Sequence, residues 1–487
     1  MSYYTASDNL ALLPALVLAV FGCAILLIEF FVKNKKTFVL SLSLAGLAGT
    51  AWALLLQTQA VGSGADKLTA FQGALSIDGF ALFFNWIFLL SSAVVILISY
   101  RFLEIEDEHH AEYYGLILLA QSGMYFLAAG TELVTIFVGL ELMAICFYVL
   151  VGFLRRERRS NEAAMKYFLL GVFSSAILAY GFSLLFGIAS STRFADITQA
   201  IQTRSLSDPI VLLALGATTA GVLFKISAVP FHMWAPDAYE GAPTPVTAYL
   251  SVGSKAASFA LLLRLFLEPL ASLRHAWQPM LIAVAVLSMT AGNLAALTQT
   301  NLKRLIAYSS ISHAGYMLLG LVAGNDTGIQ GIAVYIVVYT LTNLGALLVI
   351  AALRRKDPGS VREDDLSDIS GLASRNPAYA ALMVIFLISL AGLPPTAGFI
   401  GKYYIFLALI ETGHPILAVI ATLYVALAVY YYFRIAKAMY MGKQERPVFI
   451  ASSLGQRIAL GITGAATLLI GIYPEPVLLF AGITLLR

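Results

Sequence analysis

Long apolar runs follow one another along almost the whole chain, and short segments with charged residues, proline or glycine separate them. A helix rises about 1.5 Å per residue, so runs of this length suit a hydrocarbon core of roughly 30 Å. The pattern predicts an all-α polytopic membrane protein, a single membrane domain over residues 1–487. Its fourteen expected spans lie near residues 10–32, 38–56, 79–102, 114–129, 133–153, 164–188, 210–229, 246–267, 279–297, 305–322, 329–353, 379–410, 416–440 and 458–473.

The composition supports a place in the lipid bilayer and narrows the chemistry. Of the 487 residues, 60% are hydrophobic and 12% are charged, and the mean hydropathy is +0.84, far above that of soluble domains. Cys23 and Cys146 both lie inside apolar runs, which excludes a disulfide framework, a CxxC pair and a four-thiolate iron–sulfur site. The net charge of +3 does not indicate a nucleic-acid partner, because the basic residues lie in short loops.

The distribution of basic residues predicts the orientation. If the N-terminus lies outside and the spans alternate, twenty of the thirty Lys and Arg residues lie in inside loops and five lie outside. This excess predicts a bacterial cell membrane protein with both termini on the periplasmic side. The remaining five basic residues fall within spans: Lys166, Lys225, Lys255, Arg264 and Lys402.

Proline interrupts the seventh and the twelfth spans, at Val229-Pro230 and at Gly392-Leu393-Pro394-Pro395. Each broken span is the fourth of a group of five, namely spans 4–8 (residues 114–267) and spans 9–13 (residues 279–440). Because five is odd, the two groups would have opposite orientations. Broken helices at matching places in two inverted repeats indicate a translocation site near the middle of the bilayer.

Charged residues inside apolar runs are the main candidates for function. Glu141 lies in the middle of span 5, where a charge on an isolated helix costs about 2.5–3.5 kcal/mol. Lys225, Lys255 and Lys402 lie in or beside spans 7, 8 and 12. Any one lysine has a simpler explanation, since it could reach the membrane surface or form a structural ion pair. One carboxylate cannot neutralise three ammonium groups, however, so at least one lysine should give up its proton readily and relay protons.

Polar side chains at helical spacing accompany these charges. The stripes are Ser251, Ser254, Lys255 and Ser258 in span 8, Ser309, Ser312, His313 and Tyr316 in span 10, and Tyr335, Tyr339 and Asn343 in span 11. They could hold water along a path, or they could serve only for interhelical hydrogen bonds. His313 would be the relay between spans 8 and 12. His232 is expected to be a packed loop residue, and no metal site is predicted.

Four segments resemble a known family: FKISAVPFHMW (residues 224–234), PDAYEGAPTP (236–245), NLKRLIAYSSISH (301–313) and GLPPTAGFIGK (392–402). Together they resemble the antiporter-like membrane subunits of bacterial complex I, and among these the subunit N family, over nearly the whole chain. Subunit M typically has glutamate where this chain has Lys402, and subunit L continues beyond span 14 into a long lateral helix. The similar-sized subunit of multisubunit sodium/proton antiporters is the alternative.

The resemblance implies fourteen helices with two inverted five-helix repeats, a Glu141–Lys225 pair, a connecting Lys255 and an exit-side Lys402. It also implies a proton-translocating membrane subunit of an NADH:quinone oxidoreductase, with other membrane subunits, including antiporter-like neighbours, as partners. NADH, flavin, iron–sulfur clusters and quinone would bind to those other subunits and not to this chain. A solute carrier or a purely structural subunit fits less well, because a scaffold has no use for enclosed lysines.

Overall fold

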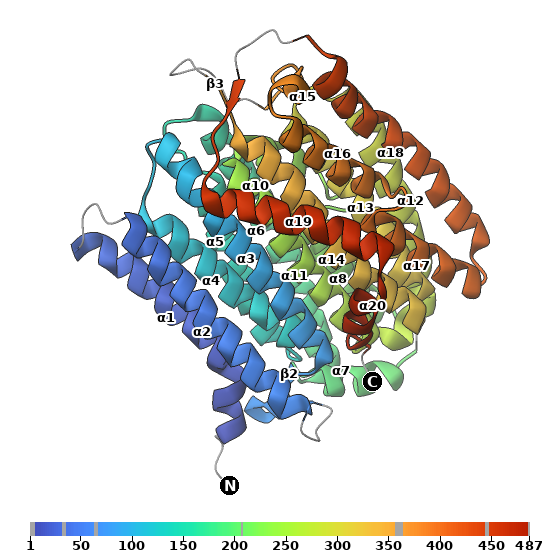
Figure 1. Ribbon diagram of the computed structural model, residues 1–487. Helices are drawn as coiled ribbons and strands as arrows, with labels where there is room; N and C mark the ends of the chain where they lie inside the picture. Colours follow the sequence, from blue (N-terminus) through green and yellow to red (C-terminus); the bar gives the residue numbers. More distant parts are fainter. Residues whose placement is uncertain are drawn as a thin grey trace.

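The computed structural model describes residues 5–31, 36–62, 67–205, 208–355, 364–443 and 448–485, and nearly all of them are helical (Figure 1). Helix is the expected state, because it satisfies every backbone group within one segment and lipid offers no partner. The helices are α1 Ala6–Phe31, α2 Lys36–Gly62, α3 Gly79–Ile105, α4 Ala111–Ala129, α5 Leu133–Val151, α6 Arg158–Ala189, α7 Phe194–Gln202, α8 Pro209–Lys225, α9 Trp234–Gly241, α10 Thr244–Tyr249, α11 Lys255–Leu267, α12 Arg274–Thr298, α13 Leu302–Ala323, α14 Asp326–Ala352, α15 Leu372–Arg375, α16 Pro377–Ala391, α17 Ala397–Glu411, α18 Pro415–Met441, α19 Leu454–Ile472 and α20 Glu475–Gly482.

Eleven segments in the described part of the chain are long and apolar enough to cross a membrane, and α10 and α11 together count as one of them. The helix α4, the shorter apolar helix α8 and the consecutive pair α16 and α17 bring the number of spans to fourteen. The predicted all-α polytopic fold is confirmed.

Both predicted breaks are present. In the seventh span α8 ends at Lys225 and α9 begins at Trp234, and in the twelfth α16 ends at Ala391 and α17 begins at Ala397. Gly392 ends α16 with a φ of +85°, a conformation that residues with a Cβ rarely adopt. The eighth span has an irregularity that the sequence analysis missed. It is the π-helical segment η2, Leu250–Ser254, which lies directly before Lys255.

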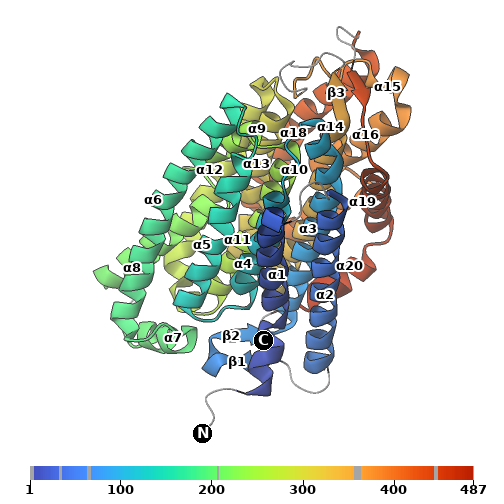
Figure 2. The ribbon, with the colours of Figure 1, turned by 90° about the vertical axis from the view of Figure 1, so that its left-hand side faces the viewer.

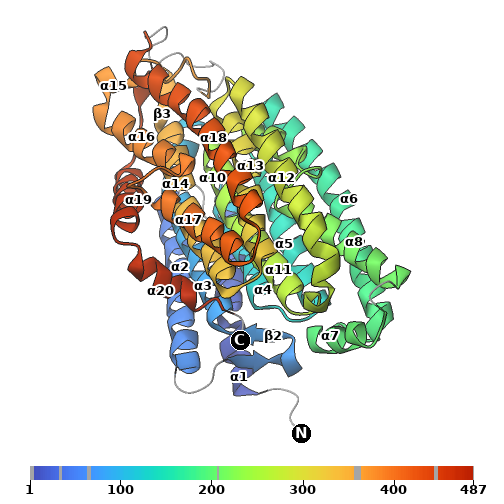
Figure 3. The same ribbon diagram turned by 90° about the vertical axis from the view of Figure 1, so that its right-hand side faces the viewer.

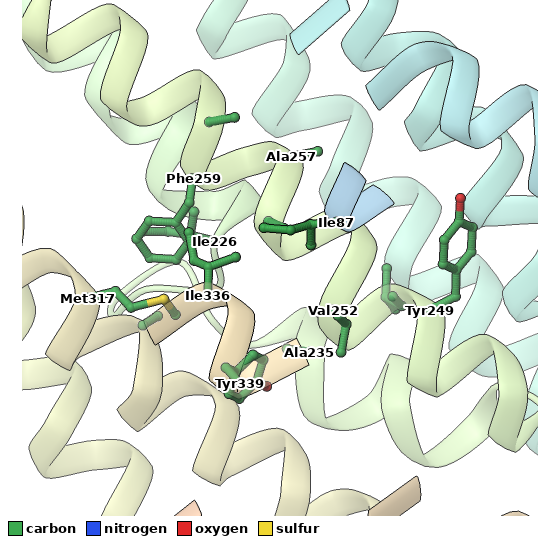
Figure 4. Packing of buried hydrophobic residues seen from close by; sticks show 14 of the residues in the cluster. Ile87, Ile226, Ala235, Tyr249, Val252, Ala257, Phe259, Met317, Ile336 and Tyr339 are labelled. Carbon is green, nitrogen blue, oxygen red and sulfur yellow. The ribbon is translucent and has the colours of Figure 1, made fainter. Parts of the chain in front are cut away.

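The middle of the molecule is built from α10, η2, α11, α13 and α14, which are almost entirely buried. Figure 4 shows Ile87 of α3, Phe259 of α11, Met317 of α13, and Ile336 and Tyr339 of α14 in this part of the core. Around it α6 packs on α8, α12 on α13, and α14 on α17. The helices α1 and α2 lie at one side of the bundle, where α1 packs on α4 (Figure 2).

The start of α1 and the C-terminal helix α20 lie at the same end of the bundle, as Figures 1, 2 and 3 show from three directions. The same end carries α7 and a hairpin of β1 (Leu68–Ala70) and β2 (Leu75–Ile77), joined by the short 3₁₀ turn η1, Phe71–Gly73. The opposite end carries α15 and the pair β3 (Leu353–Arg355) and β4 (Val448–Ile450). A second 3₁₀ turn, η3 (Ala271–Leu273), precedes α12. An even number of spans explains why both termini share one end.

Candidate functional site

Lys225 is the last residue of α8, immediately before the first break, and only 7% of its surface is exposed. Its ammonium group donates a hydrogen bond to Ser175 Oγ of α6 at 3.1 Å. The extensive packing of α6 on α8 brings these two side chains together. The enclosed charge is therefore solvated by a neutral hydroxyl.

Glu141 lies on the outward face of α5, between Val138 and Ile145, which are 60% and 55% exposed. Its Oε1 atom is buried and has no hydrogen-bond partner. The charges of Glu141 and Lys225 interact through space, but among the described residues no carboxylate and ammonium of these two come within 4.0 Å. Ser175, and not Glu141, is the hydrogen-bond partner of Lys225, and the coupling of Glu141 to Lys225 as a functional pair stays a prediction.

Lys255 is the first residue of α11 and follows the π segment η2 directly. The wider turn of a π segment changes the direction of the side chains that follow it, and such segments often occur at functional sites. The Lys255 ammonium group donates to the carbonyl oxygen of Ser310 at 2.7 Å and also to Ser310 Oγ, both on α13. It lies 5.8 Å from the centre of the Tyr339 ring. The lysine thus connects the eighth span to the tenth.

Lys402 of α17 reaches back across the second break. Its ammonium group donates to the carbonyl oxygen of Ala391 at 2.7 Å and to that of Leu390 at 3.2 Å. These carbonyls belong to the last turn of α16, where no intrahelical N–H is available and the helix dipole favours a cation. The Tyr316 ring centre lies 4.8 Å from Nζ, so the aromatic face also stabilises the charge.

His313 of α13 lies within electrostatic range of both Lys255 and Lys402. Its Nδ1 is 2.6 Å from the Tyr335 hydroxyl oxygen, and its Nε2 is 3.2 Å from the Tyr432 hydroxyl oxygen. The imidazole therefore has a proton-carrying group on each side. Lys255, His313 and Lys402 are all buried in the interior, and their role as a proton relay stays a prediction.

The polar stripes meet one another across helices. The Asn343 amide of α14 donates to Ser251 Oγ in η2 at 2.8 Å, and the Asn293 amide of α12 donates to Ser312 Oγ at 2.8 Å. Ser175, Ser310, Asn293 and Tyr432 take part in the site but were not among the predicted residues. Single serines and tyrosines in apolar helices are too common to signal a site, and only the partner from a distant helix identifies them.

Two basic residues lie in other surroundings than the sequence indicated. Lys303 was counted as a loop cation, but it is completely buried, forms an ion pair with Asp364 at 3.0 Å and donates to the carbonyl oxygen of Ala242. Lys166 was placed within a span, but its side chain is 47% exposed and pairs with Glu162 and Asp237. The reason is that α6 begins at Arg158, so Lys166 lies in the N-terminal part of this helix and not in its middle.

His232 lies between α8 and α9, partly buried, with its Nδ1 unpaired. In the part of the chain that the structure describes, no group of three or more His, Cys, Asp or Glu side chains is arranged to hold a metal ion. The ionisable groups of the site are therefore lysines, a histidine and a single carboxylate.

The fold and this site define a class: an all-helical polytopic membrane protein whose interior carries titratable side chains between two broken spans. Residues 130–428 match the family model for "NADH:quinone oxidoreductase/Mrp antiporter, TM". A protein of Solibacter usitatus named NADH-quinone oxidoreductase subunit N 2 is 60% identical over 490 residues, covering 100% of this chain and 99% of the relative. The chain belongs to the subunit N family of NADH-quinone oxidoreductases.

Solved structures agree with this assignment. A chain in the respiratory complex I of Thermus thermophilus with bound aureothin is 32% identical, with a TM-score of 0.80 and coverage of 96% of this chain and 99% of that one. A chain of the Mrp complex from Dietzia sp. DQ12-45-1b has a TM-score of 0.83 at 19% identity, covering 99% and 97%. That second likeness shows the shared fold alone. The expected resemblance to the subunit N family is confirmed.

Proposed function

We propose that this chain translocates protons as a non-redox subunit of an NADH:quinone oxidoreductase and couples electron transfer in other subunits to proton transport. One observation carries the proposal. Lys255, His313 and Lys402 form an enclosed series in which the imidazole contacts two tyrosine hydroxyls and interacts with both lysines. Membership of the subunit N family supplies the redox complex to which such a series would belong.

The proposed path enters at Glu141 and Lys225, continues to Lys255, crosses to His313 and leaves by Lys402. Each lysine of the path binds neutral oxygens, so its charge is not matched by a carboxylate within 4.0 Å among the described residues. An enclosed ammonium group of this kind pays a desolvation cost for its charge. Such a group can release its proton when a neighbouring acceptor becomes available, which a relay requires.

We further propose that a neighbouring membrane subunit covers the outward face of α5. Val138 and Ile145 are exposed there, so this face offers an apolar surface that another membrane subunit of the complex can cover. NADH, flavin, iron–sulfur clusters and quinone are assigned to other subunits of the complex.

The proposed arrangement contains two inverted five-helix repeats, residues 114–267 and 279–440, each broken in its fourth span. The end with both termini is assigned to the periplasmic side, because the loops at the opposite end contain most of the basic residues. In this orientation Lys402 lies on the half of the twelfth span that leads to the periplasm. A multisubunit sodium/proton antiporter remains the alternative, and copurification with an NADH-oxidising assembly distinguishes the two.

Replacement of Lys255 by methionine in the assembled complex tests the proposal. The variant keeps the apolar stem but removes the proton carrier, so we expect several-fold slower NADH-driven proton uptake by membrane vesicles. Lys437→Met on the exposed face of α18 is the matched control and should pump normally. Normal pumping by Lys255→Met at a normal level of assembly would exclude the proposed path.

A further inference from the structure

Arg264 is a fourth enclosed basic residue of the apolar spans, and its surroundings differ from those of the three lysines. It lies nine residues after Lys255 on α11, about 14 Å further along the helix. Only 1% of its surface is exposed. Its guanidinium group forms ion pairs with Asp78 at 2.8 Å and with Glu268 at 2.9 Å. The arginine is thus the only one of the four with carboxylate partners on two sides among the described residues.

Further contacts fix the guanidinium group in place. Its Nε donates to the carbonyl oxygen of Ala128 at 2.6 Å, at the end of α4, and its Nη2 lies 3.5 Å from the carbonyl oxygen of Ser76 in β2. Its central carbon lies 4.8 Å from the centre of the Phe80 ring. One side chain therefore joins α11, α4, β2 and the first turn of α3, at the end of the bundle that carries the termini.

An aromatic column continues from Arg264 toward the level of Lys255. Phe80, Phe84 and Phe88 follow one another on α3 with ring centres 4.8 Å and 6.2 Å apart, and all three are buried. The helices α3 and α11 pack in opposite directions, because Phe80 contacts Arg264 while Ser92 bonds to Tyr249, before α11. On α11 the buried hydroxyl of Ser258 lies between Lys255 and Arg264, so the guanidinium group separates this hydroxyl from the end of the bundle.

The corresponding end of the second repeat is more polar. Tyr316 donates to the carbonyl oxygen of Ala421 at 3.3 Å, and the hydroxyl groups of Thr290 and Tyr424 lie 2.5 Å apart. Hydroxyl groups can pass a proton, whereas a guanidinium group keeps its protons at any working pH. The two repeats therefore offer different conditions for proton release on the same side.

We propose that Arg264, held by Asp78 and Glu268 at the end of the phenylalanine column, blocks proton movement through the periplasmic end of the first repeat. A proton on Lys255 then leaves only toward His313. The proposal rests on the proposed function and adds a residue that determines the direction of proton transfer from Lys255. Glu268 follows the end of α11, and burial raises the pKa of its carboxyl group while Arg264 opposes that rise. Without Arg264 this carboxyl group would take up protons more readily and pass them inward.

The test measures passive proton leak in liposomes that contain the purified complex, with an imposed potential and no NADH. Arg264→Met should raise the leak by about an order of magnitude, because a non-titrating barrier is lost. The double variant Arg264→Met with Lys255→Met should be tight again, since the leak needs Lys255. Arg274→Met is the matched control and should be tight. Arg274 lies at the same end, and among the described residues it donates to the backbone carbonyls of Val322, Ala323 and Gly324.

If the Arg264→Met complex showed no increase in passive proton leak, Arg264 would have a structural role alone, and the proposal would be overturned. A leak that persists in the double variant, or an equal leak in Arg274→Met, would also overturn it. If Arg264→Met does not assemble, Arg264→Lys replaces it, because lysine keeps the charge but can titrate and should also leak; a tight complex would again overturn the proposal. The leak assay needs no turnover, so its result is separate from that of the Lys255→Met pumping test.

Discussion

Neutral oxygens solvate the three lysines of the path, and each lysine uses a different source. Lys225 uses a serine hydroxyl, Lys255 uses the backbone and hydroxyl of Ser310, and Lys402 uses the last carbonyls of α16. A carboxylate partner would hold the proton more firmly than these groups do. Lys303, the one buried lysine outside the path among the described residues, differs in this respect, since it is paired with Asp364.

Glu141 is the carboxylate that interacts electrostatically with Lys225 in the described part of the chain, and its own Oε1 is unpaired. We expect Glu141→Gln to slow NADH-driven proton pumping several-fold, because the amide cannot carry a proton. Glu141→Asp keeps the titrating group and should be affected less. Proton uptake and NADH oxidation are measured on the same vesicles. Equal pumping by Glu141→Gln and the unaltered complex would remove Glu141 from the path.

The broken helices show how the elements place the site. Gly392 ends α16 in the interior, which frees the carbonyls that hold Lys402, and α8 ends at Lys225, before Pro230. The spans and both breaks were predictable, because apolar runs and proline are local signals. The π segment before Lys255 and the short helices α7 and α9 were not, since nothing in those residues differs from ordinary helix or loop. The burial of Lys303 depends on Asp364, a tertiary contact that no local pattern reveals.

Gly392 lies where α16 ends against Lys402. A Cβ at this position would lie 2.6 Å from Lys402 Cδ, and the φ of +85° is unfavourable for alanine. We expect Gly392→Ala to destabilise the subunit by about 1–3 kcal/mol and to displace the ammonium group. The thermal midpoint of the purified complex should fall, together with pumping. Gly461→Ala on α19 is the control, because a Cβ there meets open space and should change neither the thermal midpoint nor pumping. If Gly392→Ala left both quantities unchanged, the expected backbone strain at Gly392 would be contradicted.

The ion pair of Lys303 and Asp364 ties α13 to the segment that follows β3. Asp364→Asn removes the carboxylate that lies 3.0 Å from a buried ammonium group, which costs about 3–5 kcal/mol. We expect less assembled complex in the membrane and a lower thermal midpoint. Glu104→Gln removes an exposed pair with Arg101 and should cost less than about 1 kcal/mol. Similar stability of the two variants would mean that the buried pair does not stabilise the fold.

At the scale of the whole molecule the site crosses the boundary between the two proposed repeats. Lys255 of the first binds Ser310 of the second, and Ser251 of the first accepts from Asn343 of the second. The four charged positions were predictable from the sequence, because charges inside apolar runs are rare and costly. Their partners, Ser175, Ser310 and Tyr432, were not, because each comes from a helix distant in sequence. Glu141 and Lys225 interact electrostatically without a contact within 4.0 Å, and their functional pairing stays a prediction.

The most direct test of the relay is the number of protons pumped per NADH by a complex with Lys402→Arg. Arginine keeps the charge and roughly the length of lysine but does not release its proton, so the account predicts a lower ratio with the complex still assembled. Lys437→Arg on the exposed face of α18 is the matched control and should leave the ratio unchanged. An unchanged ratio and rate in Lys402→Arg would contradict proton release through this residue and make it a structural cation.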